Sequence, residues 1–232
     1  MGTGPNRTTE APVNNPILDQ IQRLRAELAP GDTAPALIAA FAEGTAPLAA
    51  VAELAAQQQR IITSDRRSLL LLATRCADRP LGAWFVALAE GESAALRTLP
   101  ALAAACGLDP GAMAARPPLP GCQAYPAFLA WLGLNSRPPG AAAVALVANF
   151  AAWGGYCATI AHALRHRYGF SDEACAFFDF FAQPATELEQ QAADALGPDP
   201  LDDDTLATAL EYGRLLQAYE HLFWDTLAQV HG

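Results

Sequence analysis

One carboxylate stands on an apolar stripe of the helix expected near the end of the chain. Glu220 follows Leu216 by four residues and precedes Phe223 by three, so the three side chains share one helix face. No Lys or Arg lies three or four residues away, so the partner of Glu220 comes from another element or is a ligand. Apolar surroundings raise the pKa of a carboxyl and suit it to general acid or base catalysis. A rim position with the carboxylate in water is the alternative.

Amide side chains also occur where a helix should be buried. Three consecutive Gln residues, 57–59, cover about 300° of a helix surface, so at least one of them points inward. Asn149 lies in the middle of the most apolar stretch, where an amide without a partner is costly. Both patterns favour amides that line a pocket, although part of the Gln run must also form a polar helix face.

The aromatic residues are concentrated in the second half of the chain. Such a cluster is typical of an ordinary core, and equally of an aromatic-lined pocket for a flat heterocycle. Asn149 favours the pocket, because its amide needs a polar partner inside the bundle. The cluster comprises Tyr125, Phe150, Trp153, Tyr156, the run FFDFF at 177–181, Tyr219, Phe223 and Trp224.

The histidines and cysteines give no clear metal site. His162 and His166 are spaced i, i+4 and could face one metal ion, but the chain has neither a Glu-x-x-His pair nor an HExxH motif. We therefore expect no metal and no cofactor. The five cysteines are widely spaced and include no C-x-x-C pair, which predicts free thiols in a reducing, cytoplasmic compartment.

Gly and Pro residues between the apolar helical stretches predict an all-α protein of about seven helices. Asn15 before Pro16 is a typical helix start, and Gly169 is a typical helix end. Pro184 should kink or break a helix. The segment 107–121 is predicted to be a loop, too short and too apolar to separate domains. The expected helices cover 15–29, 34–41, 47–76, 81–105, 122–134, 140–168, a segment from 171 or 172 that Pro184 interrupts, and 204–230.

Composition limits the partners of the chain. Hydrophobic residues make up 52% and the formal net charge is −10, so the surface should repel nucleic acids and anionic lipids. Residues 141–164 carry no charge and are long enough to span a bilayer, but their small residues favour a buried central helix. Residues 1–14 are expected to form a mobile tail, and 15–232 a single domain.

Several of these stretches resemble the TenA family. YEHLFWDTL at 219–227 resembles the closing helix of the family, where Glu is followed by Phe-Trp-Asp. FAEGTAPLAAVAELAAQQQRII at 41–62 is similar to the opening of the family, and ALVANFAAW at 145–153 to its central helix. Ala124 and Tyr125 resemble the position of a pocket tyrosine, and FFDFF lies where the family has a tyrosine–tryptophan segment. The resemblance covers most of residues 15–230.

The resemblance implies a heme oxygenase-like helical bundle with a central pocket, a fold shared with the PqqC group. Thiaminase II members hydrolyse aminopyrimidines in thiamin salvage with a Cys nucleophile, an Asp and a Glu, and family proteins are often homo-oligomers. Glu220 matches the catalytic Glu and Tyr125 a pocket tyrosine. The nucleophile position falls on Asn149, the Asp position on Gln58, and two further pocket tyrosines on Trp153 and Phe177.

We therefore expect a pocket that binds or transforms a small, amine-bearing heterocycle similar to the pyrimidine of thiamin. Asn149 cannot replace a thiolate nucleophile, and Cys157 lies two turns further along the same helix. If the protein is an enzyme, Glu220 acts as general acid or base on a bound water. The alternatives are a non-catalytic binding protein on the same fold and a cofactor-free oxidase resembling PqqC. A transcriptional regulator is disfavoured by the net acidity.

Overall fold

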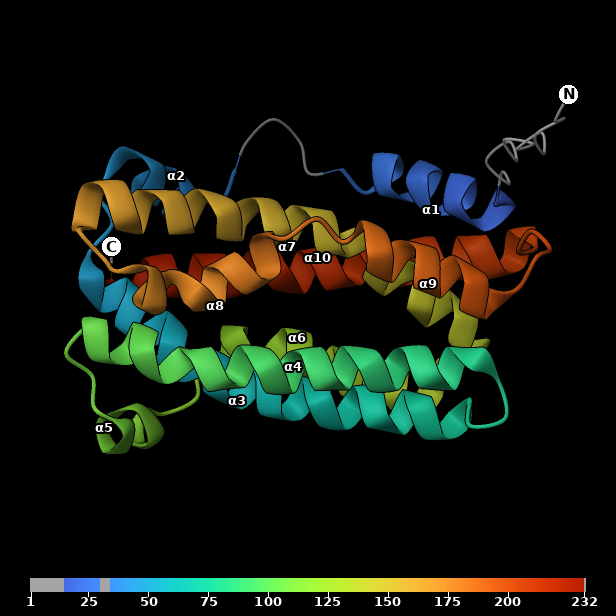
Figure 1. Cartoon of the computed structure of the whole chain (residues 1–232), viewed down its shortest axis with the longest axis horizontal. Coiled ribbons are helices and arrows are strands. Elements are labelled where there is room, and N and C mark those ends of the chain that lie inside the picture. The colour runs from blue at the N-terminus through green and yellow to red at the C-terminus, as the bar shows by residue number, and fades with distance from the viewer. Residues whose placement is uncertain (1–14, 30–33, 232) are drawn as a thin grey trace, which may run out of the picture.

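The protein is all helical in the part of the chain that the structure describes. The computed structural model describes residues 15–29 and 34–231, and the expected tail at 1–14 lies outside them. Ten helices occur within the described residues (Figure 1). Their bounds are α1 Pro16–Glu27, α2 Ala36–Glu43, α3 Leu48–Arg75, α4 Pro80–Ala105, α5 Pro110–Ala115, α6 Pro120–Asn135, α7 Pro139–Tyr168, α8 Asp172–Ala182, α9 Thr186–Leu196 and α10 Asp203–His231.

The long helices form two layers with α6 between them. Helices α3 and α4 lie side by side along the long axis in one layer, and α7 to α10 lie above them in Figure 1. Helix α6 packs on both α3 and α10, so it joins the layers. Helices α8 and α9 close the space above α4. This arrangement places residues of eight helices around one internal space.

Helix α7 is the most apolar helix of the bundle. It begins at Pro139 and ends at Gly169, which takes the left-handed conformation (φ 72°) that glycine adopts without strain. Its length and composition would allow it to cross a membrane, but half of its most apolar window is buried inside the protein. Residues 141–149 are all buried, as expected of a central helix packed against neighbours on several sides.

The structure contains more helices than the seven that the sequence predicts. The segment 107–121, predicted to be a loop, contains the short helix α5. The side chain of Asp109 accepts a hydrogen bond from the Ala112 N–H at 2.8 Å, and Pro110 occupies the first turn, so this is a capped helix start. At Pro184 the expected interruption is a complete break, which makes α8 and α9 separate helices.

The Gln run at 57–59 places two side chains in the interior, in agreement with the expectation that at least one points inward. Gln57 is fully buried and donates to Glu53 Oε1 at 2.7 Å and to the Pro117 carbonyl at 2.8 Å. Its own Oε1 accepts from the Leu119 N–H at 3.1 Å. Gln57 therefore holds the loop before α6 against α3, whereas Gln58, one residue on, faces the internal space described next.

Candidate functional site

A cavity of about 780 Å³ lies between the two layers. Its wall is formed by α3, α4, α6, α7 and α10, together with the end of α8, the 183–185 connection, the start of α9 and Arg25 of α1. Cavities of this size accommodate small organic ligands. Of the residues that the sequence assigns to a pocket, Glu220, Gln58, Tyr125, Asn149 and Trp153 line this cavity.

Helix periodicity determines which side chains α3 and α4 present. On α3 the wall consists of Gln58, Ile61, Ile62 and Asp65, which follow the i, i+3, i+4, i+7 pattern of one helix face. On α4 it includes Glu92, which lies one turn after Leu88. Each helix therefore contributes one carboxyl group within an otherwise largely apolar face.

Glu220 is buried at the α10 side of the cavity and paired with Asn149 of α7. The side chains are only 6% and 3% exposed, and Asn149 Nδ2 donates to Glu220 Oε2 at 3.3 Å. Glu220 Oε1, Asn149 Oδ1 and the indole N–H of Trp224, one turn further along α10, each have no hydrogen-bond partner within bonding distance among the described residues. Burial raises the pKa of Glu220 to about 7, although the Trp224 indole and the Asn149 amide partly oppose that rise. Near neutral pH this carboxyl can therefore give or take a proton.

Aromatic rings form an apolar part of the cavity wall, with Trp224 packed behind it. Trp153 stacks on Trp224 with ring centroids 5.4 Å apart, and Phe181 and Phe223 meet it edge-on at 5.8 and 6.2 Å. Gly154 allows this packing, because a Cβ there would lie 2.9 Å from the Phe181 carbonyl oxygen. The end of α8 therefore packs directly on α7 and brings Phe181 into the wall.

Phe177 does not line the cavity, contrary to the sequence-based expectation. Its side chain is 0% exposed and packs edge-on against Phe178 and Phe181, with ring centroids 5.2 and 5.3 Å apart. Phe177 and Phe181 lie one turn apart on the same stripe of α8, but only the later residue reaches the cavity. The aromatic contact expected from Phe177 is therefore supplied by Phe181.

Asp65 and Glu92 are site residues that sequence reasoning missed. Burial raises the pKa of both carboxyls, and the charge of Glu92 raises that of Asp65 further. The phenol of Tyr125 has a raised pKa because it is buried and lies within electrostatic range of Asp65, Glu220 and Glu92. The i, i+7 spacing from Gln58 to Asp65 was a signal for the first residue. Glu92 had no comparable signal.

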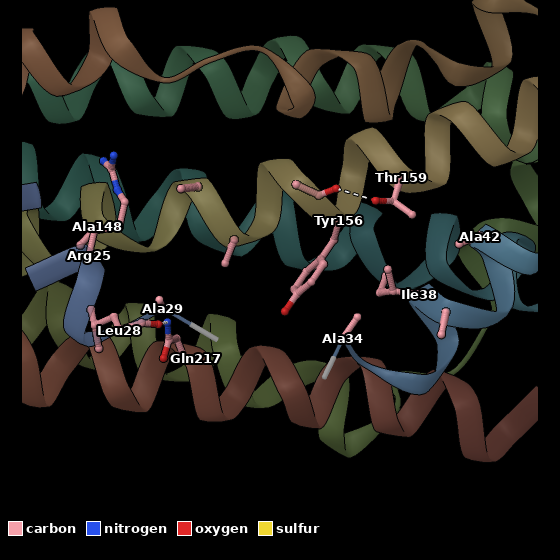
Figure 2. Close-up of a pocket in the computed structure, with 14 residues that line it drawn as sticks. Arg25, Leu28, Ala29, Ala34, Ile38, Ala42, Ala148, Tyr156, Thr159 and Gln217 are labelled. Atoms are coloured by element: carbon pink, nitrogen blue, oxygen red, sulfur yellow. Dashed lines mark hydrogen bonds between the residues drawn. The ribbon is translucent and has the colours of Figure 1, made fainter. Parts of the chain in front are cut away.

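A second cavity of about 520 Å³ lies against α1, α2, α7 and α10. Figure 2 shows the Tyr156 ring reaching from α7 into it, while Thr159 is already bonded to the Gly155 carbonyl at 3.0 Å. Gln217 is also engaged, because it donates to the Leu28 carbonyl. The wall of this second cavity is mostly alanine and leucine or isoleucine and contains no carboxyl group among its described residues. The larger cavity therefore has more side chains that can bind a polar ligand or transfer a proton.

The histidines expected to be a possible metal pair lie elsewhere. His162 and His166 are exposed on α7 with ring centroids 4.3 Å apart. Within residues 15–29 and 34–231, no group of three or more His, Cys, Asp or Glu side chains is arranged to hold a metal ion.

Comparison with known protein families matches residues 36–229 to the TENA/THI-4/PQQC family. The chain belongs to this family. The match confirms the resemblance inferred from the closing helix and the α3 and α7 stretches. Comparison with curated protein sequences gives no match.

Solved structures confirm the all-α, heme oxygenase-like fold for this TENA/THI-4/PQQC protein. A domain of unknown function with a heme oxygenase-like fold from Shewanella denitrificans is 13% identical, with a TM-score of 0.74 over 92% of this chain and 91% of that one. A TenA homologue from Pseudomonas syringae is 14% identical, with a TM-score of 0.68 over 92% and 91%. A TenA homologue from P. horikoshii is 13% identical, with a TM-score of 0.65 over 91% and 95%.

This TENA/THI-4/PQQC member presents no thiol to its cavity in the part of the chain that the structure describes. Cys157 is fully buried in the core, and burial together with the charge of Glu220 raises its pKa. Cys122 is likewise buried, with its pKa raised to about 12. Such thiols are poor nucleophiles because little thiolate is present at neutral pH.

Proposed function

We propose that the protein binds a small amine-bearing heterocycle, similar to the pyrimidine of thiamin, in the central cavity. The Glu220–Asn149 pair carries this proposal. Glu220 Oε1 and Asn149 Oδ1 are both acceptors without a partner among the described residues, and a ring amino group has two N–H donors for them. Trp153 and Phe223 add flat apolar surface on which a ring can pack. A ligand carrying only acceptors would leave these buried oxygens unsatisfied.

Glu220 further supports a hydrolytic role in which water displaces the amino group. With a pKa of about 7, its carboxylate can remove a proton from water as the water attacks the ring carbon. The resulting carboxylic acid then returns that proton to the departing amine, which leaves as ammonia. This route needs no thiol.

Non-catalytic binding is the second candidate, and the cavity chemistry gives a specific reason for it. The described wall contains no Cys, and the sequence resemblance assigns the nucleophile position to Asn149. Binding and catalysis are distinguished by ammonia release from a bound aminopyrimidine. Release above the uncatalysed rate supports hydrolysis, whereas binding without release leaves the binding role.

The test is calorimetric titration with the hydroxymethyl-aminopyrimidine of thiamin. Glu220→Gln keeps the volume but places an amide beside Asn149, and we expect affinity to fall at least about tenfold, or roughly 1.4 kcal/mol. Glu211→Gln, an exposed site on the same helix, is the matched control and should bind as the wild type does. Equal affinity in Glu220→Gln and wild type would exclude Glu220 from the binding site.

The proposal includes a cytoplasmic homo-oligomer without nucleic-acid or membrane partners. All five cysteines are free, which is typical of a reducing compartment. Trp131 and Leu134 on α6 and Leu222 on α10 are exposed apolar side chains suited to a contact between subunits. The net charge of −10 opposes binding to phosphate backbones.

A further inference from the structure

The cavity has a second polar end that the proposed function does not use. Asp65 on α3 and Glu92 on α4 both line it, in the layer opposite to that of Glu220. Asp65 is only 5% exposed, and its Oδ1 has no hydrogen-bond partner in the described parts of the chain. A buried oxygen of this kind costs free energy unless a ligand satisfies it.

No cation from the described wall balances the two carboxyls. Arg25 of α1 is the only basic side chain among the described lining residues, and its Nη2 is paired with Glu189 Oε1 of α9 at 2.6 Å. The other titratable groups in the described wall are Tyr125 of α6, Glu189 of α9 and Glu220 of α10. None of them can supply a positive charge.

Burial raises the pKa of both carboxyls, and the charge of Glu92 raises the pKa of Asp65 further, so the two cannot both be charged at low cost. The pair therefore retains a proton at pH values where free carboxyls have lost theirs. A ligand cation bound between Asp65 and Glu92 would replace that proton and remove the repulsion. The pair consequently favours a protonated amine over a neutral group of the same shape.

The acidic pair and Glu220 lie on helices of different layers, α3 and α4 for the pair and α10 for Glu220. Asp65 is influenced by Glu92, whereas the pKa of Glu220 depends on its burial, Trp224 and Asn149. Burial raises the pKa of the Tyr125 phenol, and the charge of each of the three carboxyls, all within electrostatic range, raises it further. A ligand that fills the cavity can therefore reach both acidic groups at once.

We propose that Asp65 and Glu92 bind a protonated aliphatic amino group on the α3–α4 side of the cavity, across from the layer that carries the Glu220–Asn149 pair. This ammonium site rests only on the cavity, the two carboxyls that line it and the unpartnered Asp65 oxygen.

The experiment compares benzylamine with benzyl alcohol, which have the same shape but differ in charge. Calorimetry at pH 7.5 should show the wild type binding benzylamine at least about tenfold more tightly. The isosteric double variant Asp65→Asn/Glu92→Gln should lose this preference, and Glu90→Gln, an exposed site on α4, should retain it. Wild-type affinity for benzylamine should weaken toward pH 6, because protons then compete with the ammonium group for the carboxyl pair.

Equal binding of the two probes by the wild type, or a preference that survives in the double variant, would overturn the proposal. If the double variant does not fold, Glu92→Gln at the half-buried position provides the same comparison. The hydroxymethyl-aminopyrimidine titration is independent of this result. Failure of that titration alone removes the heterocycle site, and loss of the amine preference alone removes the ammonium site.

Discussion

The two ends of the cavity handle buried carboxyl groups in different ways. Glu220 is a single carboxyl with an amide neighbour, Asn149, whose N–H group donates to it at 3.3 Å. Asp65 has another acid, Glu92, as its electrostatic neighbour. One end therefore has a donor that stabilises the charged form, whereas the other has a second negative group that opposes it.

This difference separates the chemistry of the two ends. A single carboxyl with a pKa near neutrality can exchange a proton with a substrate, as acid or base. Two acids in one apolar site tend to hold a shared proton until a cation displaces it. The Glu220 end is thus suited to proton transfer or to a neutral amine, and the Asp65 end to charge recognition. Each of the following predictions separates the two ends by a different measurement.

The largest expected effect on stability comes from neutralising the acidic pair. Both acids have a raised pKa in the folded state, so the native protein holds protons that the unfolded chain releases. Their contribution to stability is therefore lost as pH rises from the unfolded pKa, near 4, through the raised values. At pH 8, Asp65→Asn/Glu92→Gln should increase the free energy of unfolding by on the order of 4 kcal/mol. Urea unfolding of variant and wild type from pH 4 to pH 8 measures this.

At pH 4 the two proteins should differ much less, because both carboxyls are then protonated in the folded state and about half protonated in the unfolded chain. Parallel stability curves across this range would show that the pair is solvated and that the two ends do not differ as described. The exposed control Glu90→Gln should follow the wild type.

Glu220→Gln should give a smaller effect of the same sign. Its folded pKa of about 7 lies above the ordinary 4.5, so wild-type stability declines as pH rises between these values. Removing the charge should stabilise the protein at pH 8 by about 3 kcal/mol at most, less the loss of the Asn149 hydrogen bond. Thermal unfolding at pH 5 and pH 8 measures the difference, with Glu211→Gln as control. A pH-independent difference would place the Glu220 head group in water.

Helix periodicity made the Glu220 end predictable from sequence. A carboxylate on an apolar helix stripe and an amide within an apolar helix are each unfavourable without a polar partner. In the structure the two side chains meet, and the Asn149 amide donates a hydrogen bond to Glu220. At the Asp65 end, only one of the two carboxyl groups could be predicted from the sequence. Asp65 falls on the Gln58 face by the i, i+7 rule, but Glu92 depends on which face of α4 meets α3, and that is set by packing between distant segments.

The same limit explains Phe177. Sequence places Phe177 and Phe181 on one stripe of α8, but the depth of that stripe depends on where α8 ends against α7. Gly154 allows the Phe181 backbone to approach α7, which leaves Phe177 one turn deeper in the core. Periodicity identifies a helix face reliably, and tertiary packing decides which turn of that face borders a cavity.

The smallest effect concerns the hydrogen bond that distinguishes the two ends. Asn149→Leu keeps the side-chain size but removes the donor to Glu220, so the pKa of Glu220 should rise further above 7. The expected change is about 1 kcal/mol of differential interaction between charged and neutral forms. Carbon NMR titration of labelled glutamate side chains reports it, and the titration of Glu92 should not move. An unchanged Glu220 pKa would mean that burial alone sets its value, and the difference between the two ends would then lie in the Asp65–Glu92 repulsion.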